Sequence, residues 1–155
     1  MTQAEKYAWG SLVTTGFIFW FFQNAMLDGW QVRQMPAPAL LRIFVITIIM
    51  FVVAEAVIAG SIALMGGSDD IEKDERDLLI EMKAEQNASW FMGTALLILI
   101  GHMLIGGVIR GHEFLQFDLT QPSSFFFVLY SVVIVATIVQ RVSTLALYGM
   151  ASARA

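Results

Sequence analysis

Apolar positions in this chain form four long runs separated by short polar connectors. The runs cover residues 9–27, 41–65, 88–109 and 125–148. About 20 apolar residues in a helix are enough to cross the roughly 30 Å hydrocarbon core of a bilayer. Because lipid offers no hydrogen-bond partner to an open strand, each run is expected to be helical. The pattern predicts an all-α membrane protein, a four-transmembrane-helix bundle that forms one domain over residues 1–155.

The composition agrees with a location in lipid. Hydrophobic residues make up 57% of the chain and charged residues only 14%, and the mean hydropathy is +0.70. The absence of cysteine excludes a disulfide framework, thiolate catalysis and cysteine-held zinc or iron–sulfur clusters. A net charge of −4 without a basic patch argues against nucleic acid. No nucleophile–base pair or metal-ligand cluster stands out, so we expect a non-enzymatic protein without metal or cofactor.

The distribution of lysine and arginine indicates the orientation, because these residues are enriched in cytoplasmic loops. Lys6, Lys73, Arg76, Lys83 and Arg154 fall on one side of the expected spans, and Arg33, Arg42 and Arg110 fall on the other. This five-to-three distribution favours both termini in the cytoplasm. The connector between the second and third runs is expected on the same side.

The densest charge in the chain lies in that connector, over residues 69–87. Asp69 and Glu72 have capping-box spacing, and Glu72 and Arg76 stand four residues apart, a spacing that supports a helix. We therefore expect the third helix to begin near Asp69 and to extend through the cytoplasm before it enters the membrane. Acidic residues here also match a calcium-loop spacing, but Glu75 stands where that loop requires glycine, so we expect no calcium site.

The stretch DERDLLIEMKA, residues 74–84, resembles the central motif of a family of small bacterial integral membrane proteins of unknown function. In that family the motif lies between the second and third of four spans. Glu5-Lys6 matches a pair that often precedes the first span, whereas the basic ending that often follows the last span is reduced here to Arg154. The resemblance implies a bacterial cytoplasmic membrane and a motif inside the cell, and it implies no activity.

The same charged stretch is the best candidate docking surface for a partner or a second subunit. Its interaction residues are expected to be Asp74, Glu75, Arg76, Asp77 and Lys83. The alternative is a solvated extension of a membrane helix, without a partner.

The two halves of the chain show weak internal similarity. EKYAWGSLVTTG from Glu5 matches EQNASWFMGTAL from Glu85 in a few positions, and SIALMG from Ser61 matches TLALYG from Thr144. The offsets are 80 and 83 residues. A duplicated two-helix hairpin keeps its orientation in the membrane, so the halves would be parallel repeats.

Two ionisable residues lie inside the apolar runs, Glu55 in the second and Arg141 in the fourth. An unpaired charge at the bilayer centre costs at least about 2.5 kcal/mol. At about 1.5 Å per residue, Glu55 lies roughly 15 Å and Arg141 roughly 10 Å from the inner ends of their spans, a difference that an arginine side chain covers. We expect an intramembrane ion pair, within the bundle or across a dimer interface. Alternatively, Arg141 snorkels to the headgroups, and a protonated Glu55 hydrogen-bonds to a group such as Thr47.

His102 in the third run supports two further alternatives. One is a proton or ion pathway through Glu55, His102 and Arg141, although the helix faces around these residues are apolar. The other is a haem or pigment site. A haem with two axial histidines needs a partner at the same depth, and His112 lies about 15 Å along the same segment. A second copy of the chain would have to supply that partner.

Small residues mark expected helix contacts, because they let backbones approach closely in a membrane. The candidates are Ala56, Gly60, Gly101, Gly107 and Gly111. Trp20 and the phenylalanines from Phe17 to Phe22 are expected to face lipid. Together these patterns predict a non-enzymatic membrane protein that acts by association, as a homo-oligomer or as an accessory subunit of a larger membrane complex.

Overall fold

The computed structural model describes residues 3–65, 75–108 and 118–152, and these residues are almost entirely helical. The helices are α1 (Gln3–Met26), α2 (Ala37–Met65), α3 (Glu75–Val108) and α4 (Pro122–Ser152). The strands are a short antiparallel pair, β1 (Leu27–Asp28) and β2 (Gln31–Val32). The all-α prediction is confirmed.

Three of the described helices are long and apolar enough to cross a membrane: α2, α3 and α4. α1 is not among them. It has 24 residues, and its sequence includes Glu5, Lys6 and several uncharged polar residues.

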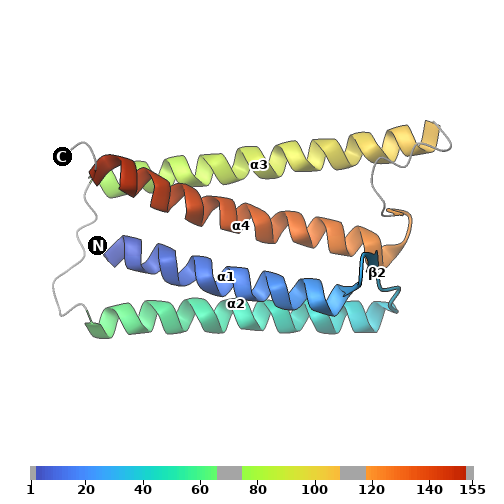
Figure 1. Ribbon diagram of the computed structural model, residues 1–155, viewed down its shortest axis with the longest axis horizontal. Coiled ribbons are helices and arrows are strands. Elements are labelled where there is room, and N and C mark those ends of the chain that lie inside the picture. The colour runs from blue at the N-terminus through green and yellow to red at the C-terminus, as the bar shows by residue number, and fades with distance from the viewer. Residues whose placement is uncertain (1–2, 66–74, 109–117, 153–155) are drawn as a thin grey trace.

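The helices lie side by side in the order α2, α1, α4, α3 (Figure 1). α1 packs against both α2 and α4, and aromatic contacts of Phe44 with Phe126 and Tyr130 also join α2 to α4. α3 packs mainly against α4. The architecture is a three-helix core of α1, α2 and α4 with α3 attached to α4, so that α2 and α3 lie on opposite edges.

The apolar core lies where α1 ends and α4 begins. It consists of Phe22, Met26, Leu40, Phe127 and Ile134. Phe22 is fully buried, and its ring stacks on Phe127 and meets Tyr130 edge-on. The expectation that all the phenylalanines of this part of α1 face lipid is therefore wrong for Phe22, although Phe17 and Trp20 are exposed. Four-residue spacing from Ile18 places Phe22 on the inner stripe of the helix.

A tight turn joins α1 to α2. Gly29 has a φ of 63° and occupies the first central position between the paired strands, where a type II′ turn favours glycine. The amide of Arg33 donates to the carbonyl of Met26 at 2.8 Å, which closes the connection. Pro38 lies in the first turn of α2, where proline does not interrupt a helix.

α3 is one uninterrupted helix that includes both charged and apolar sequence. The first six residues of the charged stretch, 69–74, lie outside the described residues. From Glu75 onward the helix runs alongside the last turns of α4, and the two helices reach about the same end of the molecule (Figure 1). The sequence predicts a charged segment that projects into the cytoplasm. In the part that the structure describes, from Glu75 onward, this segment lies beside α4 with Ile80 and Ala84 buried.

Candidate functional site

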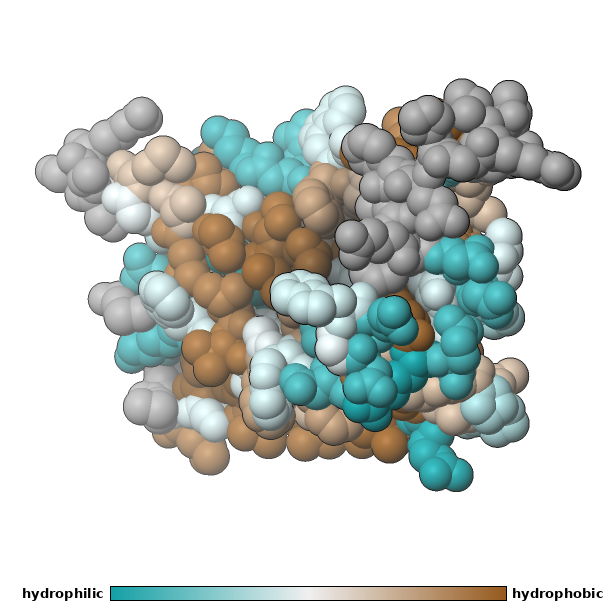
Figure 2. Space-filling view, turned by 45° about the vertical axis from the view of Figure 1, so that its right-hand side comes forward, coloured by the Kyte–Doolittle hydropathy of each residue, from teal (hydrophilic) through white to brown (hydrophobic). Residues whose placement is uncertain are grey.

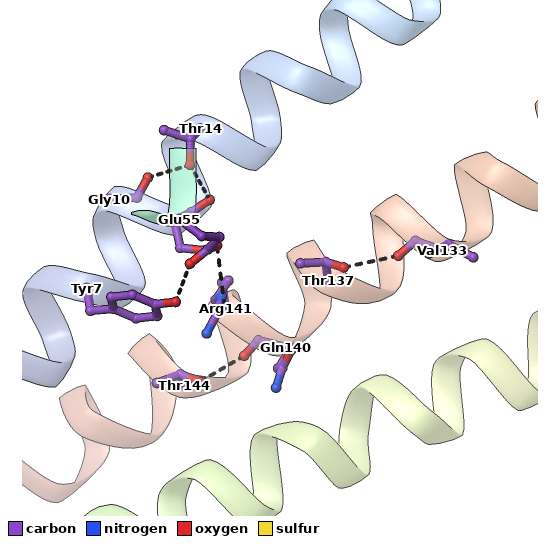
Figure 3. Close-up of polar contacts among 10 residues, drawn as sticks. Tyr7, Gly10, Thr14, Glu55, Val133, Thr137, Gln140, Arg141 and Thr144 are labelled. Atoms are coloured by element: carbon purple, nitrogen blue, oxygen red, sulfur yellow. Dashed lines mark hydrogen bonds and ion pairs between the residues drawn. The ribbon is translucent and has the colours of Figure 1, made fainter. Parts of the chain in front are cut away.

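A polar cluster forms between α1, α2 and α4, well inside the helices. It consists of Tyr7 and Ser11 from α1, Glu55 from α2 and Arg141 from α4. Figure 3 shows Tyr7 and Arg141 directed toward Glu55 from two different helices. The structure thus brings together the two ionisable residues that the sequence analysis paired.

Glu55 accepts contacts at both carboxylate oxygens. The hydroxyl of Tyr7 donates to Oε2, and the hydroxyl of Ser11 donates to Oε1 at 2.6 Å. Nη2 of Arg141 lies 3.7 Å from the same Oε1. Because an ionised carboxylate is only an acceptor, two hydroxyl donors and a guanidinium suit the charged form.

Arg141 contacts Tyr7 as well as Glu55. The guanidinium carbon lies 5.1 Å from the centroid of the Tyr7 ring, a cation–π geometry. The side chain of Arg141 is 20% exposed and that of Glu55 is 31% exposed. These contacts engage the guanidinium inside the protein, in contrast to the alternative in which Arg141 snorkels to the headgroups.

The sequence of α1 explains how Tyr7 and Ser11 reach Glu55. They stand four residues apart, so they lie on the same face of the helix, and Ser11 is fully buried. α2 packs against this face through Ile58, whose Cγ2 would lie 3.4 Å, an ordinary contact distance, from a Cβ atom added at Gly10. Sequence reasoning missed Tyr7 and Ser11. The four-residue spacing of Tyr7, Ser11 and Thr15 could have indicated them, because it places three hydroxyl groups on one face of an otherwise apolar helix.

A second group of polar contacts lies about two helical turns away from Glu55. Thr47 lies eight residues before Glu55 on α2, and its hydroxyl lies 2.8 Å from that of Tyr130. Thr47 also donates to carbonyls of its own helix, so the alternative of a Thr47–Glu55 hydrogen bond is not seen. The rings packed around Phe22 lie next to this group, and Gln23 donates a hydrogen bond of 3.4 Å to Ser131 beside them. Between the two levels, the Thr15 hydroxyl is buried without a partner among the described residues.

His102 lies apart from the polar cluster. It is on α3, where Asn87 contacts Ser143 of α4 at 3.3 Å. α3 and α4 are antiparallel, so moving fifteen residues along α3 from Asn87 to His102 corresponds to moving fifteen residues back along α4 from Ser143 to residue 128. His102 therefore lies about 20 Å along the helix axis from Arg141. The structure does not bring His102 to the other two residues of the pathway alternative.

The charged motif holds α3 to the end of α4. Tyr148 donates a hydrogen bond of 2.7 Å to Oδ1 of Asp77. Glu75, Arg76 and Lys83 are exposed. Asp74, the remaining residue of the expected docking surface, lies outside the described residues.

The small residues expected at helix contacts face outward where the structure describes them. Ala56 and Gly60 are exposed on α2, and a Cβ atom at Gly60 or at Gly101 would meet nothing within 4 Å. Packing inside this chain therefore does not use them. Gly107 lies in the last turn of α3, and Gly111 falls outside the described residues.

Among the described residues, no three histidine or acidic side chains are placed to hold a metal ion. Comparison of the chain with known protein families, curated proteins and solved structures finds no match.

Proposed function

We propose that this is a non-enzymatic integral membrane protein that acts by association, as a homodimer or as an accessory subunit of a larger membrane complex. It crosses a bacterial cytoplasmic membrane four times, with α1 as the fourth span and both termini in the cytoplasm. The bacterial assignment rests on the resemblance of the DERD stretch.

The observation that carries this proposal is the position of the two most exposed apolar helices. α2 and α3 lie on opposite edges (Figure 1) and leave many apolar side chains uncovered, and broad apolar areas lie on the surface in Figure 2. Helices associate in lipid through close packing at small residues, and Ala56 and Gly60 are exposed on α2. An arrangement with two open edges supports a role in assembly.

The polar cluster also supports a non-transport role, because its contacts join three helices of the same chain. Tyr7, Ser11 and Arg141 contact Glu55 from within the chain, and about two helical turns away the rings of Phe22 and Tyr130 pack against each other. An ion pathway needs a continuous series of polar groups across the membrane. The contacts therefore favour a structural role, in which the polar cluster holds α1, α2 and α4 together, and they disfavour an ion pathway.

The test is to measure the oligomeric state and the bound partners of the full chain after extraction in a mild detergent. Light scattering on the protein–detergent complex gives the number of copies, and mass spectrometry identifies stoichiometric companions. We expect either a dimer or a complex with a second membrane protein. A monomer without a stoichiometric companion contradicts the proposal. Proton flux in liposomes that is lost in Glu55→Gln but retained in Ser143→Ala would favour transport instead.

A further inference from the structure

A stripe of polar side chains lies on the part of α4 that passes Glu55. Spacings of three and four residues place its members on one side of the helix: Thr137, Gln140, Arg141 and Thr144. All four are partly exposed, and Figure 3 shows them together on α4. Because α4 is long and apolar enough to cross a membrane, polar side chains exposed on it need a polar group to contact. These four residues are named the α4 stripe below.

Hydrogen-bond donors outnumber acceptors around the α4 stripe. Each oxygen of Glu55 already accepts a hydroxyl. The guanidinium of Arg141 has five N–H donors and no acceptor, yet among the described residues it makes only the 3.7 Å ion pair with Glu55 and the contact with the Tyr7 ring. Its Nε is buried without a partner there. The amide of Gln140 adds two further donors beside it. What this part of the molecule lacks is an acceptor.

Contacts between α3 and α4 give the depth of the α4 stripe. Asn87 contacts Ser143, and since the two helices are antiparallel, Trp90 lies at about the level of Gln140. Trp90 is 71% exposed, as is usual for a tryptophan at a membrane–water interface. The exposed charge of Glu85 lies only about 8 Å further along α3. For both side chains to suit their surroundings, hydrocarbon must end close to the α4 stripe.

Two ionisable side chains are partly uncovered at this level. The side chain of Glu55 is 31% exposed and that of Arg141 is 20% exposed. Contact between a charged group and hydrocarbon is costly, so a polar group has to reach them. At the edge of the hydrocarbon, the headgroup region of the bilayer begins.

We infer that the α4 stripe binds the phosphate of a membrane phospholipid, with the guanidinium of Arg141 and the amide of Gln140 as donors. The guanidinium keeps its contacts with Glu55 and Tyr7, and the lipid phosphate approaches it. This site goes beyond the proposed function, because binding a lipid requires no partner protein.

The chemistry of the α4 stripe selects a phospholipid. Phosphate oxygens only accept hydrogen bonds, and a planar guanidinium matches their geometry. Val133 lies four residues before Thr137 on the same side of α4 and is 49% exposed. It continues the stripe as apolar surface toward the middle of the bilayer, where an acyl chain of the bound lipid would lie. A free phosphate ion would make no use of that surface.

Three variants separate the phosphate site from the stability of the fold. Arg141→Gln alone would leave the carboxylate of Glu55 without its cation, so the double variant Glu55→Gln/Arg141→Gln replaces the whole pair by neutral amides. Glu55→Gln keeps the guanidinium and removes the carboxylate that competes with a phosphate for it. Arg42→Gln is the matched control, since Arg42 is an exposed arginine near the opposite end of the molecule.

The experiment measures lipid binding to the full chain in detergent after removal of bound lipid, by native mass spectrometry. The probes are phosphatidylglycerol, a diacylglycerol with the same acyl chains, and inorganic phosphate. We expect the wild-type chain to hold one phosphatidylglycerol more tightly than either of the other probes. Glu55→Gln should bind it at least as tightly, and Arg42→Gln should leave the affinity unchanged. The double variant should bind it about tenfold more weakly, since hydrogen bonds to a charged group are lost.

Several results would overturn the inference, each with a different meaning. Equal binding of the diacylglycerol shows that apolar surface alone holds the lipid. Inorganic phosphate that binds as tightly as phosphatidylglycerol identifies a site for a free anion. An unchanged affinity in the double variant shows that water supplies the missing acceptor, and an equal loss in Arg42→Gln shows that any exposed arginine suffices. None of these results bears on the proposed function, which is read from the number of copies and the companions of the chain.

Discussion

Tyr148 near the end of α4 donates a hydrogen bond to Asp77 near the start of α3, with 2.7 Å between the two oxygens. α3 packs mainly against α4, and this bond fixes the start of α3 to the end of its main packing partner. It also gives one residue of the charged motif a structural task inside the chain.

Removing that hydroxyl should loosen the start of α3. Tyr148→Phe keeps the ring and loses the donor to a carboxylate, which costs about 1.5 kcal/mol at the lower end of the range for a charged partner. We expect tryptic cleavage at the exposed Lys83 to accelerate about tenfold, the rate change that corresponds to this energy when local opening controls cleavage. A double-mutant cycle with Asp77→Ala isolates the bond. Fully additive effects of the two substitutions would contradict the assignment.

The Glu55–Arg141 pair should tolerate exchange better than the loss of one charge. Glu55→Arg alone brings two cations together, and Arg141→Glu alone brings two carboxylates together, so each should lower the thermal stability of the purified protein. The double exchange restores opposite charges, and the hydroxyls of Tyr7 and Ser11 can also accept hydrogen bonds from an arginine. We expect it to recover part of the loss. Equal damage from the double exchange and from either single change would refute the pairing.

Two substitutions at Tyr7 separate its hydroxyl from its ring. Tyr7→Phe removes the hydrogen bond to Glu55 and keeps the ring that lies under Arg141. Tyr7→Leu removes both. Unfolding measurements should give a loss of about 1.5–3 kcal/mol for the first change, the usual range for a hydrogen bond to a charged group. The second change should cost a further 0.5–1 kcal/mol or so from the cation–π contact. Identical losses would show that the ring contact contributes nothing.

The stability of the turn before α4 should depend on pH. Hydrogen bonds from the hydroxyl and then from the amide of Thr120 lower the pKa of Asp118 below its usual value, because they favour the charged carboxylate. Their contribution is therefore present above the ordinary aspartate pKa and is lost as pH falls through the lowered one.

Thr120→Ala tests this origin of the lowered pKa. An NMR titration should show the pKa of Asp118 move up toward its usual value in this variant. Thr137→Ala serves as the control, because its hydroxyl bonds only within α4. An Asp118 pKa that does not move in Thr120→Ala would assign the shift to another cause.

Helix content and the pairing of Glu55 with Arg141 were predictable because both depend on distances along single helices. Apolar runs mark helices, and counting the rise per residue gives the depth of a charge. The pairing needed no knowledge of how the helices are arranged, since both residues are costly to leave alone in lipid.

Tyr7, Ser11 and the helix order were not predictable in the same way. Hydroxyl residues carry no charge that demands a partner, so their role depends on how α1 is rotated toward α2. The order α2, α1, α4, α3 depends on packing between helices that are all apolar, for which hydropathy gives no preference. For the same reason the expected helix contacts at Gly60 and Gly101 were not found within the chain. A small residue permits a close contact, but it does not specify the partner helix.

The connection between α1 and α2 is held at two places that lie far apart along the helices. At one end the glycine turn at Gly29 joins the strands, and the amide of Arg33 bonds to Met26. Toward the other end, the hydroxyls of Tyr7 and Ser11 donate hydrogen bonds to Glu55. These two attachments oppose both a hinge-like opening of the hairpin and a sliding of one helix along the other. α1 and α2 should therefore move as one rigid body.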